Sequence, residues 1–229
     1  MFDSNILIYS LLGGIIPALF WLWFWLREDR LHPEPRRMIF NAFMMGMVIV
    51  FIVLPLEKYA EKITTGLLMI VIWAFIEELF KLIGAYLSGI RKKECDEPID
   101  PMIYLVTVAL GFAAMENTLF LISSFGDGNF LTPILTGNLR FIGASLLHVL
   151  ASGIVGFFLT ISFYYKKFWK YIIGFFGLLV ATLLHFLFNF FIMEGEGNNT
   201  FIVFCFVWAL IILLLVAFEK AKKLGSKKI

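Results

Sequence analysis

The sequence predicts an all-α, polytopic membrane helix bundle of about seven transmembrane helices, and three observations support this class. Hydrophobic residues make up 61% of the 229 positions, and the mean hydropathy of +0.90 is far above that of soluble domains. Apolar runs long enough to span a bilayer recur along the whole chain. Charged or turn-rich segments separate these runs. We see no internal repeat, so we expect residues 1–229 to form a single integral-membrane domain.

The first three expected spans occupy residues 6–26, 38–56 and 66–89. The first has about 20 apolar residues and follows an acidic start without a small-residue cleavage site, so we expect it to be retained. Its tryptophans are expected to contact lipid and anchor the helix at the interface. Thr64 or Thr65 can cap the third helix, which ends at Gly89.

Four further spans are expected at residues 102–125, 139–163, 171–193 and 201–218. A hydrophilic connection, 91–101, precedes the first of these, and its Asp100 and Pro101 supply an N-cap and a first-turn proline. A glycine-rich loop, 126–138, leads into the fifth span. The last span is followed by a basic tail at about 219–229.

Positively charged residues predict the orientation of the bundle. The segments 27–37, 91–93, 166–170 and 219–229 hold 15 of the 19 Lys and Arg residues, whereas the connection 57–65 holds two. Because Lys and Arg favour cytoplasmic loops, we expect the N-terminus outside and the C-terminus in the cytoplasm. The chain is then integral to the cell membrane and surrounded by the lipid bilayer, and we expect no nucleic-acid partner.

Glu77, Glu78 and Lys81 lie within the third apolar run. A charged residue at the centre of a spanning helix costs about 2.5–3.5 kcal/mol, so these three require partners inside the protein. Glu77 and Lys81 share a helix face at a spacing of four, and Glu78 can reach Lys81 at a spacing of three. The ammonium balances one carboxylate, and the other remains. We therefore expect a functional polar site inside the membrane.

Three other spans bring ionisable groups to the same depth. Glu116, His148 and His185 lie, like the acidic pair, about 10–15 residues from the expected inner ends, or roughly 15–22 Å at 1.5 Å per residue. Both histidines belong to stripes of small residues, which let membrane helices approach closely, so we expect them to face protein. Asn189 lies one turn beyond His185. These groups predict a buried polar chamber at mid-membrane depth.

The ordered motifs of these spans resemble those of the PrsW-type intramembrane proteases. The motifs are Glu77-Glu78-x-x-Lys81, Phe112-x-x-x-Glu116-Asn117, His148 and His185-x-x-x-Asn189, preceded by Pro33-Glu34-Pro35. The resemblance runs over about residues 29–189, and the family is distantly similar to the CAAX prenyl endopeptidases. It implies an intramembrane endopeptidase acting on a membrane-bound protein, in PrsW-like cases the first cut of an anti-sigma factor.

The resemblance also implies roles for individual residues. The glutamate pair would hold the residue that activates water, and His185 with Asn189 would bind the developing oxyanion. Glu116 stands where the CAAX enzymes have a histidine, so their acid–base geometry does not transfer. Peptide hydrolysis needs a base, an oxyanion donor and an acid for the leaving amine, which these side chains can supply. The expected catalytic residues are Glu77, Glu78, Glu116, His148, His185 and Asn189, with Lys81, Phe112 and Asn117 in support.

Two alternatives remain open at this point. The buried carboxylates exceed the ammonium by two charges, which either protons or a divalent cation can neutralise. Zinc would find ligands in His148, His185, Glu78 and Glu116, yet the sequence lacks a His-Glu-x-x-His pair, and the CAAX similarity favours a metal-free mechanism without cofactor. A proton-coupled transporter could use the same carboxylates as a relay, but it would favour paired repeats and broken helices.

Overall fold

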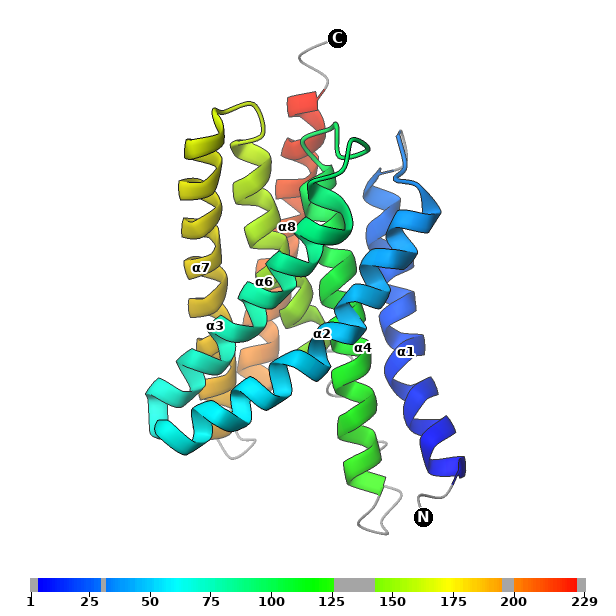
Figure 1. Cartoon of the computed structure of the whole chain (residues 1–229), viewed down its shortest axis with the longest axis vertical. Coiled ribbons are helices and arrows are strands. Elements are labelled where there is room, and N and C mark those ends of the chain that lie inside the picture. Colours follow the sequence, from blue (N-terminus) through cyan, green and yellow to red (C-terminus); the bar gives the residue numbers. More distant parts are fainter. Residues whose placement is uncertain (1–3, 30–31, 126–142, 195–199, 226–229) are drawn as a thin grey trace.

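The computed structural model is a bundle of long helices, which confirms the all-α membrane class (Figure 1). It describes residues 4–29, 32–125, 143–194 and 200–225. The long helices within these ranges are α1 (Ser4–Leu26), α2 (Arg36–Ile63), α3 (Gly66–Ala85), α4 (Asp100–Phe125), α6 (Ala144–Ile161), α7 (Lys167–Glu194) and α8 (Thr200–Gly225). A 3₁₀ turn, η1 (Arg27–Asp29), follows α1, and a π-helical turn, η2 (Tyr86–Ile90), follows α3.

Among the described residues, six helices are long and apolar enough to cross a membrane, namely all of those above except α3. α3 differs because Glu77, Glu78 and Lys81 interrupt its apolar run. These three side chains are buried within the bundle, where α3 packs between α2 and α7. The prediction of about seven helices is therefore confirmed, although α3 carries a polar face and only the other six are apolar spans.

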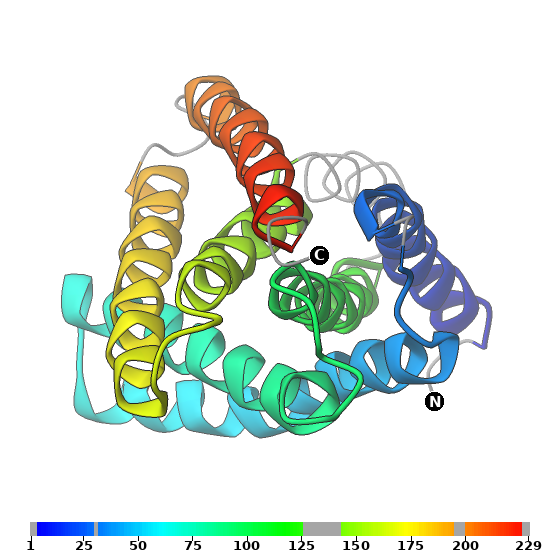
Figure 2. The same ribbon diagram turned by 90° about the horizontal axis from the view of Figure 1, so that it is seen from above.

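α4 lies at the centre of the bundle, enclosed by α1, α2 and α6 (Figure 2). Its residues from Asp100 to Ala114 are all buried. Glycine allows α2 to cross α4 closely, since a Cβ at Gly111 would lie 2.0 Å from the carbonyl oxygen of Phe43. Small residues at such crossings are typical of membrane helices, whose association depends on close packing. The enclosed position of α4 makes it a rigid support for the residues that it carries.

The corner between α2 and α3 differs from the prediction. α2 continues through Pro55 to Ile63 instead of ending at residue 56, because a proline inside a membrane helix is tolerated where neighbouring groups satisfy the backbone. Thr64 donates its hydroxyl to the Ala60 carbonyl and so closes α2, and no side-chain hydrogen bond caps α3. Gly66 makes the turn with a positive φ of 61°, which glycine adopts without strain.

Two other predicted helix ends also differ. Gly89 lies inside η2 against the ring of Tyr104, and so it does not end α3 as a C-cap. Asp100 is the first residue of α4, and its carboxylate accepts the backbone N–H of Glu97 at 2.7 Å. The expected loop 126–138 and the first residues of the span 139–163 lie outside the described residues.

α1 and α8 meet through aromatic side chains. Trp21 packs against Trp208, and Trp25 packs against Phe218 with ring centroids 5.2 Å apart. Trp21 and Trp25 are buried, so the expectation of lipid contact was wrong for them, whereas the third tryptophan of α1, Trp23, is exposed. The end of α8 also pairs with η1 and brings the C-terminal residues to the same end of the bundle as the segments after α1, η2 and α6 (Figure 1). Which side of the membrane this end faces stays a prediction.

Candidate active site

The acidic pair of α3 is held by a buried lysine. The Nζ atom of Lys81 lies 2.7 Å from Oε1 of Glu78 and 3.2 Å from Oε2 of Glu77. Lys81 is fully buried, so its ammonium has exchanged water for these two carboxylates. The helix spacings of three and four produce the two contacts, as predicted.

Histidines from α6 and α7 join this group, together with a glutamate from α4. Nδ1 of His185 lies 2.8 Å from Oε1 of Glu78, and Nε2 of His148 lies 2.8 Å from Oε2 of Glu116. Both imidazoles are buried, and their ring centroids are 5.3 Å apart. The sequence-based expectation that α3, α4, α6 and α7 bring ionisable groups to one depth agrees with this geometry.

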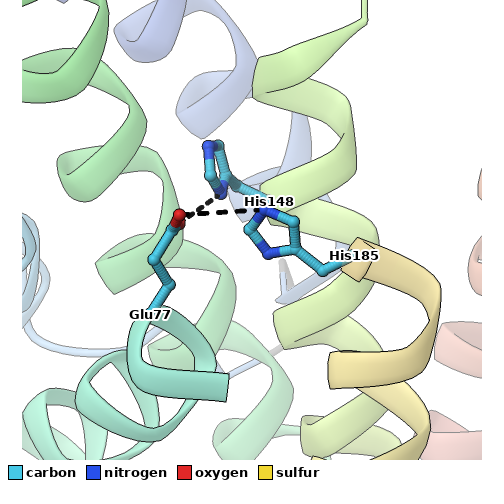
Figure 3. A group of neighbouring side chains, drawn as sticks. All are labelled: Glu77, His148 and His185. Carbon is cyan, nitrogen blue, oxygen red and sulfur yellow. Dashed lines mark ion pairs between the residues drawn. The ribbon is translucent and has the colours of Figure 1, made fainter. Parts of the chain in front are cut away.

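Glu77 faces both imidazoles, as Figure 3 shows. Its Oε2 lies 3.8 Å from Nδ1 of His148, and its Oε1 lies 3.9 Å from Nε2 of His185. These separations are too long for hydrogen bonds. Donor atoms that share one tetrahedral zinc ion at about 2.0–2.2 Å would be roughly 3.4 Å apart, close to the spacing here. One donor atom from each of the three residues lies within 4.8 Å of the others, so Glu77, His148 and His185 can hold a metal ion.

The outer nitrogen of each histidine supports the same interpretation. Glu116 approaches Nε2 of His148, and Glu78 approaches Nδ1 of His185, which leaves the opposite nitrogens facing Glu77. A metal-binding histidine usually donates its other ring N–H to a carboxylate or carbonyl. The residues therefore fit a bound cation in number, kind and orientation. Lys81 lies 2.8 Å from Nδ1 of His148, so a metal bound there would replace that contact.

The carboxylates are arranged differently from the zinc ligands expected from the sequence. That set combined both histidines with Glu78 and Glu116, whereas the structure places these two carboxylates behind the imidazoles. Glu77 occupies the position between the imidazoles instead. The reason is the 100° rotation between successive residues of a helix, which turns Glu77 and Glu78 toward different neighbours.

A cavity of about 500 Å³ lies against this group. Its polar lining includes Glu77, Glu116, His148, His185 and Asn189, and apolar side chains from α3, α4, α6, α7 and α8 complete its walls. Glu116 is more accessible than Glu77, with 33% of its side chain exposed against 10%. The volume is within the range of small-molecule and peptide-binding pockets.

Glu57 is a further residue of this cavity that the sequence reasoning missed. Its backbone carbonyl accepts the indole N–H of Trp73 at 3.2 Å, which fixes the end of α2 against α3. The signal that could have located Glu57 is the segment 57–63, EKYAEKI, which contains no turn residue and continues the helix.

Of the residues expected to support the site, Phe112 contacts its charged groups, whereas Asn117 joins two helices. The ring of Phe112 lies against the ammonium group of Lys81, whose Nζ is 4.5 Å from the ring centroid, and it also contacts the His148 ring. Asn117 donates to the hydroxyl of Ser145 at 3.1 Å and so connects α4 to α6 rather than lining the cavity. The hydroxyl of Ser152 lies 3.3 Å from Glu78.

A second acidic group lies at the end of the bundle, and we call Asp29, Glu34, Glu97, Asp100 and Tyr104 the loop cluster. Glu34, from the Pro-Glu-Pro motif, accepts the hydroxyl of Tyr104 and donates its own backbone N–H to Asp29 at 3.1 Å. Burial raises the pKa of the Glu34 carboxyl above its ordinary value. Tyr104 is twelve residues before Glu116 on α4, or roughly 18 Å away along the helix. The motif thus fastens the first loop to α4.

Comparison with known families identifies the chain. A family model described as "PrsW family intramembrane metalloprotease" matches residues 34–216. The chain belongs to the PrsW family. It is therefore a membrane-embedded protease, and the resemblance that its motifs carry is confirmed.

Curated relatives extend the PrsW match over nearly the whole chain. "Protease PrsW" of Halalkalibacterium halodurans is 25% identical over 225 residues, covering 93% of this chain and 96% of the relative. The Oceanobacillus iheyensis protein of that name is 29% identical over 220 residues, covering 92% and 95%. The Bacillus subtilis protein is 28% identical over 151 residues, covering 64% and 66%. No solved structure matches.

The PrsW family description bears on the choice between mechanisms. It names a metalloprotease, and the structure brings Glu77, His148 and His185 within ligand distance of one another. Both findings favour the zinc alternative over the metal-free glutamate mechanism that the sequence favoured. The transporter alternative is set aside, because the relatives and the family model are proteases.

Proposed function

We propose that this protein is a metal-dependent endopeptidase that cleaves a membrane protein at the mid-bundle cavity, with Glu77, His148 and His185 holding a divalent cation. One observation carries the proposal: a carboxylate and two imidazoles converge on the cavity, and each imidazole has a second carboxylate behind it. Two histidines and one glutamate form a known catalytic zinc ligand set, with a position left open for water or substrate. When bound, such an ion would polarise a peptide carbonyl and lower the pKa of water.

The charge of the site supports a cation. Four carboxylates, those of Glu57, Glu77, Glu78 and Glu116, stand against the single ammonium of Lys81. If all are ionised and both histidines are neutral, the buried site carries three excess negative charges. Isolated buried charges are strongly unfavourable, so protons or cations must compensate them. A divalent cation would remove two of these charges, and one proton on a carboxyl group would remove the third.

The surrounding side chains supply the remaining chemistry. Glu116 reaches both the cavity and Nε2 of His148, so it is placed to accept a proton from water and to deliver it to the leaving amine. Asn189 lines the same cavity, where its amide can donate to a developing oxyanion. Glu78 orients His185 and is itself held by Lys81. These are the roles that we assign to the predicted catalytic residues.

The depth of the cavity supports a membrane-bound substrate. Glu116, His148 and His185 come from helices that are long and apolar enough to span a bilayer, and Glu77 comes from α3, which packs among them. A protein that itself crosses the membrane can reach this depth without exposing apolar segments to water. Cleavage of an anti-sigma factor, as the motif resemblance implies, is one case of such a reaction. The orientation with the N-terminus outside remains part of this proposal.

The test is cleavage by purified protein in lipid vesicles. Epitope-tagged single-span membrane proteins from the same genome serve as substrates, and gel electrophoresis detects new fragments. The wild type should produce fragments from at least one of them, whereas Glu77→Gln and His185→Ala should produce none. Glu61→Gln is a matched control, because Glu61 is exposed at the end of α2. Fragments formed equally by the wild type and both site variants would contradict the proposal.

A further inference from the structure

A second hollow opens beside the catalytic cavity, between α7 and α8. It has a volume of about 360 Å³, and its described lining is entirely apolar. Leu184, Leu187 and Phe191 line it from α7, and Val203, Phe206 and Leu210 line it from α8. On each helix these positions recur at spacings of three or four residues, so each helix presents one continuous face. We call this hollow the α7–α8 groove.

The α7–α8 groove adjoins the catalytic cavity, since Phe188 lines both. The ring of Phe188 stacks on that of Phe204, with centroids 6.4 Å apart and an interplanar angle of 3°. Phe204 also lines the cavity. His185 is three residues before Phe188, so it lies on a neighbouring part of the same helix face. A pair of aromatic rings therefore stands between an apolar groove and the metal-binding group.

The two helices that form the groove are loosely packed against each other. α7 packs along α6 and α3, and α8 packs mainly against α6, whereas α7 and α8 share few contacts. Figure 2 shows the two helices diverging. Phe206 is 57% exposed and Leu187 is 37% exposed, so the groove is open on the side that faces lipid. A guest can thus enter between α7 and α8 without disrupting a tightly packed interface.

We propose that the α7–α8 groove receives the transmembrane segment of the protein substrate and delivers its cleavage site past Phe188 to the catalytic cavity. This rests on the proposed function. Two apolar helix faces with a trough between them suit a third helix, because association in a membrane depends on side-chain packing. The groove adjoins a polar cavity, which an unwound peptide needs and a lipid chain does not.

A groove further along the same face of α8, toward its C-terminal end, provides the comparison. It lies between α6 and α8, has a volume of about 350 Å³ and is lined mainly by apolar residues such as Ile154, Leu213 and Leu214. It shares Leu210 with the α7–α8 groove, but none of the residues that line it also lines the catalytic cavity. The two grooves are similar in volume and apolar character, but only the α7–α8 groove shares a lining residue with the catalytic cavity. A substrate should therefore use only the α7–α8 groove.

Two tryptophan variants test the proposal. Leu187→Trp fills the α7–α8 groove, and Leu213→Trp fills the other groove; both leucines are exposed, so the larger ring can be accommodated. Each variant is assayed on the single-span protein that the wild type cleaves and on a soluble synthetic peptide covering its cleavage site. Leu187→Trp should slow cleavage of the single-span protein by about tenfold or more, in the range that overfilling a packed site produces. Peptide cleavage should stay within about twofold, and Leu213→Trp should behave as wild type.

Photo-crosslinking gives a second measurement that does not depend on turnover. A photoreactive amino acid replaces Phe206 or Leu213 in the His185→Ala protein, and irradiation should trap the single-span protein at position 206 only. Unchanged cleavage by Leu187→Trp, an equal loss on both substrates, or crosslinks to lipid alone at position 206 would overturn the proposal. Failure of the proposed function is distinct, because the wild type would then cleave neither the single-span protein nor the peptide.

Discussion

The catalytic site and the loop cluster both bury carboxylates, and their difference lies in what the carboxylates face. In the loop cluster, Asp29 and Asp100 accept backbone N–H groups, and Glu34 accepts a tyrosine hydroxyl. In the catalytic site, the carboxylates face an ammonium, two imidazoles and a cavity of about 500 Å³. Fixed backbone donors hold a carboxylate in place, whereas imidazoles and a cavity allow protons, metals and substrates to exchange.

Proximity of acidic groups does not by itself distinguish the two regions. Asp29, Glu97 and Asp100 also bring one oxygen each within 4.8 Å of the others, as the donors of Glu77, His148 and His185 do. The imidazoles make the difference, because nitrogen donors suit zinc and other transition metals better than carboxylates alone do. The comparison teaches that the partners of a buried carboxylate, rather than its burial, indicate its function.

The largest expected effect is that of Glu77→Gln. The amide is a weaker metal ligand and cannot accept a proton, so cleavage of the single-span substrate should fall by at least about 10³-fold. His148→Ala should have a similar effect. Initial rates in lipid vesicles, normalised to folded protein, provide the measurement. Retention of more than about a tenth of the wild-type rate by Glu77→Gln would remove this residue from the catalytic set.

An intermediate effect is expected for the carboxylates behind the histidines. Glu78→Gln and Glu116→Gln each remove the partner of a metal-binding imidazole, which typically reduces metal affinity or activity by about 10–100-fold. The rate of Glu78→Gln should recover partly when zinc is added in excess, because the metal ligands remain. Glu116→Gln should not recover, because it also lacks the carboxylate that we propose accepts a proton from water. If Glu78→Gln reduced the rate more than Glu77→Gln and did not respond to zinc, Glu78 would be the metal ligand and Glu77 the residue that orients a histidine.

A smaller effect on activity is expected in the loop cluster. Tyr104→Phe removes the hydroxyl that donates to Glu34 and leaves a buried carboxyl group without this partner. Thermal unfolding in detergent should show a loss of about 1–3 kcal/mol in stability. The cleavage rate of the folded protein should stay within about twofold of wild type, because the hydroxyl does not line the catalytic cavity. A rate reduced as strongly as in Glu116→Gln would make the loop cluster part of the active site.

No change in activity is expected from cysteines that report the orientation. Lys62→Cys and Lys92→Cys place thiols at exposed positions at opposite ends of the bundle, in a protein whose Cys95 and Cys205 are replaced by alanine. The distribution of Lys and Arg predicts that an impermeant thiol reagent labels position 62 in intact cells and position 92 only after lysis. Labelling of position 92 in intact cells would invert the orientation of the bundle.

The sequence predicts those features that depend on local composition. Apolar length defines the spans, and charged residues inside an apolar run must point inward, so the meeting of Glu78, Glu116, His148 and His185 could be inferred from depth alone. Six apolar spans and a polar α3 agree with that inference. The depths of these four side chains follow from the rise per residue of an α-helix, which is the same in every protein.

The remaining features depend on packing between helices. Whether Glu77 or Glu78 stands between the imidazoles depends on how α3 is rotated between α2 and α7. Glu57 lines the cavity because α2 continues past Pro55. The proline and the charged residues after it led the sequence-based prediction to end the helix at residue 56. Burial of Trp25 required its partner Phe218 on α8, nearly 200 residues later in the chain.

Metal content tests the central claim most directly. Protein purified without added metal should contain about one zinc ion per chain by elemental analysis, and Glu77→Gln and His148→Ala should contain far less. Prolonged chelation should abolish cleavage of the single-span substrate, and stoichiometric zinc should restore it. Full activity in protein that holds no stoichiometric metal and is unaffected by chelation would contradict the account and restore the metal-free glutamate mechanism.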